Sequence, residues 1–122
     1  MTYKVTCHCG AVELAVDFPD GLTNLKRCNC SICRRKGAIM AYAAGENVTL
    51  VKGEDVLTTY SFHTHAAQHH FCSVCGIYTH HRPRFDPALV GINTGCIEGV
   101  TPEDVADYEL LDGVNHPMDA KS

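Results

Sequence analysis

The chain has 122 residues, 45% of them hydrophobic and 20% charged, as is typical of a soluble protein with one modest core. Its formal net charge of −4 argues against a nucleic-acid partner, because binding phosphate needs a basic face. No apolar run is long enough to span a bilayer, and the first residues lack the apolar stretch of a signal peptide. We therefore expect a cytoplasmic protein with one domain, residues 1–122, and an acidic C-terminal segment from about residue 98 to residue 122.

Short strands are expected along most of the chain. Residues 3–18 alternate in their second half, with Leu14, Val16 and Phe18 on one side, which predicts a half-buried strand. Glycine-containing turns separate several of the later candidates. Further strands are predicted at residues 22–30, 38–44, 48–52, 56–62, 69–71, 77–81, 89–94 and 108–111. A threonine, a proline and two acids at residues 101–104 favour a short helix. The expected fold class is mainly β, a small antiparallel domain.

The cysteines are the most informative feature of the sequence. Seven of the eight fall into three clusters: Cys7 and Cys9; Cys28, Cys30 and Cys33; and Cys72 and Cys75. Clustered thiols in a reducing compartment indicate bound metal rather than disulfides. The first and third clusters each end in a glycine, which permits a tight turn with backbone N–H groups facing the sulfurs. Two such pairs supply the four thiolates of a closed, structural zinc site.

The middle cluster predicts a second and different zinc site. Cys28, Cys30 and Cys33 lie in one short segment, and three thiolates leave the fourth position of a tetrahedral zinc vacant, as in catalytic sites. The alternative is that Cys96 or a histidine closes this site and leaves no room for a substrate. The histidines considered are His63, His65, His69, His70, His80 and His81.

A basic run surrounds the middle cysteines. Residues 21–45 contain no acid, and their five cations are Lys26, Arg27, Arg34, Arg35 and Lys36. Such a run is either a solvated face or a site for anionic groups, and arginine has the planar fork that fits a carboxylate. The position of the run beside three candidate zinc ligands leaves both interpretations open.

Three motifs in this order resemble those of one family. They are Cys-His-Cys-Gly-Ala-Val at residues 7–12, Cys-x-Cys-x-x-Cys-Arg at residues 28–34 and Phe-Cys-x-x-Cys-Gly at residues 71–76. The chain resembles, from about residue 5 to residue 95, the glutathione-dependent formaldehyde-activating family, also called the centromere-protein-V domain. The resemblance implies a zinc-bearing, mainly β fold of the β-tent type. It also implies a structural zinc on the first and third motifs and a catalytic zinc on Cys28, Cys30 and Cys33.

The reaction implied by the resemblance joins the thiol of glutathione to formaldehyde, giving S-(hydroxymethyl)glutathione. In reverse it is a carbon–sulfur lyase reaction. Zinc with three thiolates carries a net charge of −1, and a fourth thiolate makes it −2, so nearby cations are needed. We expect Lys26, Arg27, Arg34, Arg35 and Lys36 to offset this charge and to pair with the carboxylates of glutathione. Two alternatives remain open: a zinc-stabilised protein-binding module without chemistry, and a redox switch formed by the middle thiols.

Overall fold

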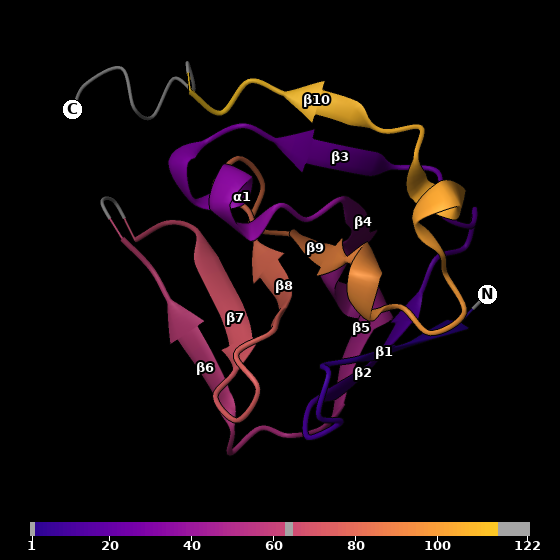
Figure 1. The fold of residues 1–122 in the computed structure, drawn as a ribbon, viewed down its shortest axis with the longest axis vertical. Helices are drawn as coiled ribbons and strands as arrows, with labels where there is room; N and C mark the ends of the chain where they lie inside the picture. Colours follow the sequence, from indigo (N-terminus) through magenta and orange to yellow (C-terminus); the bar gives the residue numbers. More distant parts are fainter. Residues whose placement is uncertain (1, 63–64, 115–122) are drawn as a thin grey trace.

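The computed structural model describes residues 2–62 and 65–114 (Figure 1). The strands are β1 (Thr2–Thr6), β2 (Glu13–Asp17), β3 (Leu25–Cys28), β4 (Met40–Ala44), β5 (Val48–Lys52), β6 (Leu57–Tyr60), β7 (Gln68–Cys72), β8 (Tyr78–Arg82), β9 (Leu89–Asn93) and β10 (Glu109–Leu111). The helices are α1 (Ser31–Lys36) and three 3₁₀ turns, Gly45–Asn47, Thr94–Cys96 and Pro102–Val105. Within these residues, no helix is long and apolar enough to cross a membrane.

The strands form two sheets. One has three strands in the order β1-β2-β5, and the other has seven in the order β10-β3-β4-β9-β8-β7-β6 (Figure 1). Neighbouring strands pair antiparallel throughout the described residues, except that β10 runs parallel to β3, with Leu111 opposite Cys28. The structure confirms the mainly β fold class.

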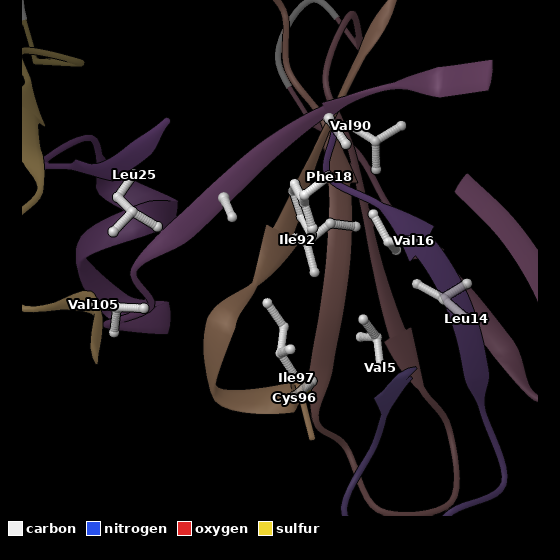
Figure 2. Close-up of a cluster of buried hydrophobic side chains, with 12 residues drawn as sticks. Val5, Leu14, Val16, Phe18, Leu25, Val90, Ile92, Cys96, Ile97 and Val105 are labelled. Carbon is white, nitrogen blue, oxygen red and sulfur yellow. The ribbon is translucent and has the colours of Figure 1, made fainter. Parts of the chain in front are cut away.

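One apolar core lies between the two sheets (Figure 2). The small sheet contributes Val5, Leu14 and Val16, and the large sheet contributes Val90 and Ile92. The alternation in β2 explains this arrangement, because side chains two positions apart in a strand share a face. Full burial of each such side chain stabilises the fold by about 1.5–3 kcal/mol. The packing of these side chains therefore holds the two sheets together.

Strand β4 has the core on one face and a candidate site on the other. Ala41 and Ala43 belong to the core between the sheets, whereas Met40 and Tyr42 pack with Cys33 in a separate cluster. These four residues of β4 are all buried, which is expected of a strand covered on both faces. This strand thus separates the structural core from the surroundings of the middle cysteines.

The structure differs from the sequence-based expectations in three places. Residues 3–18 form two strands of a hairpin, because the first cysteine motif makes a turn between them. The residues after Cys30, where no helix was predicted, form α1, and this helix ends at Gly37 with φ 65°. The last strand, β10, is parallel to its neighbour rather than antiparallel. The short helix expected near residue 101 is present as the 3₁₀ turn Pro102–Val105.

Candidate metal centres and the adjoining cavity

Four cysteines from two hairpins meet at one end of the molecule. Cys7 and Cys9 lie in the turn between β1 and β2, and Cys72 and Cys75 lie at the turn between β7 and β8, both at the bottom of Figure 1. The Sγ of Cys9 is 3.6 Å from that of Cys7 and 3.7 Å from that of Cys72. All four sulfurs lie within 4.8 Å of one another. Sulfurs at about 2.3 Å from a tetrahedral zinc are about 3.8 Å apart, so this spacing fits zinc.

The two turns share a local structure that favours thiolates. Gly10 and Gly76 adopt φ values of 82° and 77°, which lets each chain fold back over its cysteine pair. The backbone N–H groups of Val12 and Val74 donate to the first sulfur of each pair, at 3.3 and 3.4 Å. Backbone hydrogen bonds also lower the pKa of Cys75 to about 6. These donors stabilise negative charge on sulfur, as a metal-binding thiolate requires.

The three middle cysteines form a second group on different elements. Cys28 ends β3, Cys30 caps the N-terminus of α1, and Cys33 lies within the helix. The N–H of Cys30 donates to the Sγ of Cys28 at 3.4 Å, and the N–H of Cys33 donates to the Sγ of Cys30 at 3.5 Å. Hydrogen bonds from the Cys28 and Cys33 thiols lower the pKa of Cys30. The three sulfurs lie within 4.8 Å of one another and fit a zinc that has one further position.

Among the described residues, no further cysteine or histidine joins the three middle sulfurs. Cys96 lies in the core between the sheets (Figure 2), where its Sγ is 3.5 Å from the carbonyl oxygen of Tyr78. Burial raises the pKa of Cys96 to about 12, so it is held as a neutral thiol. His63 lies outside the described residues. The structure therefore does not bring Cys96 to the middle cluster.

The segment after β10 packs against the middle cysteines and forms hydrogen bonds with Asn29 between them. The side-chain oxygen of Asn29 accepts from the N–H of Gly113 at 2.7 Å and from the N–H of Val114 at 3.2 Å. Gly113 packs so closely that an added Cβ would overlap the Sγ of Cys28 and lie 2.6 Å from the Cβ of Cys30. The acidic C-terminal part of the chain thus contributes directly to the shape of the three-cysteine group.

A cavity of about 770 Å³ opens beside the three middle cysteines. This volume is within the range of about 300–1,000 Å³ that is usual for small-molecule sites. Its wall combines the three cysteines with aromatic, histidine and arginine side chains: Phe62, Phe85, His69, His81, Arg34 and Arg84. The four-cysteine group has no part in this lining. Only the middle group is therefore placed to meet a ligand in the cavity.

Four of the five cations of the basic run have different surroundings. Arg34 lines the cavity, and Lys26 instead forms an ion pair with Glu109 of β10. The Arg27 guanidinium lies 6.0 Å from the centre of the Tyr108 ring. The fourth, Arg35, donates to the carbonyl oxygen of Ser31 on its own helix. One further arginine, Arg84, lines the cavity. Arg84 lies outside the basic run, so the sequence pattern gave no signal for it.

A group of buried and half-buried polar side chains lies near the middle cysteines. The Nζ of Lys36 is 3.1 Å from the Nδ1 of His69 and 3.8 Å from the centre of the Tyr78 ring. The hydroxyl of Tyr78 is 2.6 Å from the Nδ1 of His81, and the hydroxyl of Tyr42 is 3.5 Å from its Nε2. Burial lowers the pKa of Lys36, and the nearby thiolates of the middle cluster oppose this shift. Lys36 is therefore the cation best placed to offset the thiolate charge.

We expect two zinc ions per chain in freshly purified, reduced protein. The reason is that two sulfur groups, of four and three cysteines, have spacings that fit tetrahedral zinc. Elemental analysis with a protein assay measures this ratio directly. One zinc per chain, with the three middle thiols freely reactive toward a thiol reagent, would contradict the two-site arrangement.

Comparisons with known proteins agree with this geometry. The family model described as "Glutathione-dependent formaldehyde-activating enzyme" matches residues 2–109. A Halomonas elongata protein named for the same activity is 36% identical over 83 residues, which are 62% of this chain and 52% of that protein. The match thus spans about half the length of this curated relative. A crystal structure of a Rhodobacter sphaeroides protein is similar with a TM-score of 0.84 and 46% identity, covering 88% of this chain and 99% of the other.

Proposed function

The chain belongs to the glutathione-dependent formaldehyde-activating enzyme family, as its cysteine motifs indicated, and on that basis we propose that it is an enzyme of carbon–sulfur bond chemistry. Its reaction is the addition of a thiol such as glutathione to formaldehyde, giving S-(hydroxymethyl)glutathione, and the reverse lyase reaction. The cofactor is zinc, two ions per chain. Cys7, Cys9, Cys72 and Cys75 hold a structural ion, and Cys28, Cys30 and Cys33 hold the ion at the active site.

One observation carries this proposal: the group with three sulfurs borders the cavity, whereas the group with four sulfurs does not. A closed four-thiolate site stabilises a fold, and a three-ligand site keeps a position for substrate. Formaldehyde offers almost no surface for recognition, so the thiol partner must supply the binding energy. The cavity of about 770 Å³ has room for a peptide-sized thiol of this kind.

The residues around the cavity have different roles in binding the thiol. A zinc ion on the three middle cysteines, when bound, lowers the pKa of a coordinated thiol. Arg34 and Arg84 are positioned to pair with carboxylates of glutathione, because both line the cavity. Lys36 offsets the negative charge of the three middle cysteines. The aromatic rings of Phe62 and Phe85 add apolar surface to the lining of the cavity.

We expect reduced glutathione to bind the zinc-loaded protein, and Arg34→Ala to weaken that binding about fivefold, equivalent to about 1 kcal/mol for one partly exposed ion pair. Added salt should weaken binding of the parent protein, because exposed ion pairs are screened over about 8–10 Å. Binding should also weaken below neutral pH, where protons compete for the thiol. Isothermal titration calorimetry measures the dissociation constant in each case.

Arg35→Ala is the matched control, because Arg35 neighbours Arg34 on α1 and does not line the cavity. Its dissociation constant should equal that of the parent protein within twofold. Cys33→Ser should abolish binding if the thiol meets the three-cysteine group. No heat at millimolar glutathione, with two zinc ions present, would defeat the enzyme assignment and favour a zinc-stabilised protein-binding module.

A further inference from the structure

His69 is a buried side chain that lines the cavity and has one unpaired nitrogen. It lies on β7, is 6% exposed and lines the cavity together with the middle cysteines. Within the described residues, its Nε2 has no hydrogen-bond partner. A buried polar atom without a partner costs about 1–3 kcal/mol, so such an atom in a residue that lines a cavity suggests a ligand group that pairs with it.

The contact with Lys36 determines what His69 offers to a ligand. The Nζ of Lys36 lies 3.1 Å from the Nδ1 of His69, and a lysine ammonium can only donate. Burial and the nearby lysine lower the pKa of His69 to about 4, so the ring is neutral at neutral pH. A neutral imidazole that accepts at Nδ1 carries its proton at Nε2. The unpaired atom is therefore an N–H donor.

The ring of His69 is held in a fixed orientation. It stacks on Phe62 at 6.0 Å and on His81 at 5.5 Å between ring centres, with interplanar angles of 21° and 15°. His81 lies directly opposite His69 in the β7–β8 pairing. A donor that is oriented before the ligand arrives loses no freedom on binding, which makes it effective toward developing charge.

The other histidines of the β7–β8 hairpin do not compete for this role. Both nitrogens of His81 have tyrosine hydroxyls as neighbours. His70 and His80 stack on each other at 4.6 Å, and neither lines the cavity. His69 also stays outside the group of three sulfurs, although the ring and the cysteines line the same cavity.

We propose that the Nε2–H of His69 donates a hydrogen bond to the oxygen of the aldehyde and of its thiol adduct, making His69 a catalytic residue of the proposed reaction. The inference rests on the proposed function. In the addition, the thiol sulfur forms the new bond to carbon, and the carbonyl π pair moves onto oxygen. The proton released by the thiol ends on that oxygen, so one thiol and one aldehyde give one hydroxymethyl thioether. The donor stabilises the oxygen while its negative charge develops.

The test compares His69→Phe, His69→Gln and His70→Phe in protein loaded with two zinc ions. Phenylalanine keeps the ring stack and removes the donor, whereas glutamine keeps an N–H near the Nε2 position. Exchange NMR of glutathione with formaldehyde gives kcat above the spontaneous rate. We expect His69→Phe to lower kcat about 100-fold, as loss of one such donor does. The kcat of His69→Gln should be at least tenfold higher than that of His69→Phe. The kcat of His70→Phe should equal that of the parent protein.

Two further measurements separate a catalytic role from a structural one. Zinc content and the glutathione dissociation constant should be unchanged in His69→Phe, and loss of zinc would overturn the inference. In ¹⁵N NMR of the parent protein, His69 should carry its proton at Nε2, and a proton at Nδ1 would also overturn it. An unchanged kcat in His69→Phe overturns the catalytic role of His69 but leaves the proposed function standing. A parent protein with no rate above the spontaneous one overturns the proposed function and this inference together.

Discussion

Cys72→Ser is expected to unfold the domain or to leave it aggregated. Cys72 is fully buried, and its group joins the β1–β2 turn of the small sheet to the β7–β8 turn of the large sheet. Zinc binding contributes roughly 10–16 kcal/mol in zinc-finger peptides at neutral pH, comparable to the 5–15 kcal/mol that stabilises a typical domain. Loss of one ligand therefore removes most of what opposes unfolding. Circular dichroism and thermal unfolding of the purified variant measure the effect.

Cys33→Ser is the control for this experiment, because its zinc ligands all lie within residues 28–33 at the junction of β3 and α1. Removing this ion leaves the core between the sheets and the four-cysteine group intact. The variant should stay folded with one zinc per chain. Equal loss of structure in both variants would show that the middle group is also a structural site.

The cysteine groups could be predicted from the sequence because metal ligation sets strict local spacing. Pairs separated by one or two residues and followed by a glycine can form a turn around a metal without help from the rest of the fold. The structure brings Cys7, Cys9, Cys72 and Cys75 together, as that spacing predicted. Most strands could be predicted for a similar reason, since alternation along β2 depends only on neighbouring residues.

The parts of the site that depend on distant segments could not be predicted in this way. The parallel pairing of β10 with β3 joins residues 109–111 to residues 26–28, and no local signal specifies that partner. Arg84 reaches the cavity from the segment between β8 and β9, far from the basic run. His69 shares its residue type with several neighbours, and only its buried position beside Lys36 distinguishes it.

The α-helix after Cys30 was missed because its helical signal is weak. Six residues are too few for a stable helix on their own, and two of them, Ile32 and Cys33, have modest helix propensity. The helix is capped at both ends: the side chain of Cys30 accepts from the N–H of Cys33 at its start, and Gly37 caps its end. The sequence pattern of three cysteines was sufficient to predict the sulfur cluster but not the helix that arranges it.

Gly113→Ala is expected to weaken zinc binding at the middle group about 100-fold while leaving the fold intact. An added Cβ would overlap the Sγ of Cys28 and lie 2.6 Å from the Cβ and 3.1 Å from the N of Cys30. The clash falls on a metal ligand and its neighbour rather than on the core, so the cysteine loop must shift. Changes in groups that orient ligands typically cost 10–100-fold in metal affinity. Competition with a chromophoric zinc chelator measures the affinity of each site.

Two companion variants show whether the effect comes from the clash. Val114→Ala shortens the neighbouring side chain, which is 62% exposed, and should leave both zinc affinities unchanged. Asn29→Ala removes the acceptor for the N–H groups of Gly113 and Val114, so it should weaken the same site, by about tenfold. The four-cysteine site should keep its zinc in all three variants, because none of these residues contacts that group. If the zinc affinity of the three-cysteine site in Gly113→Ala is within threefold of that in the parent protein, the segment after β10 has no part in shaping this site.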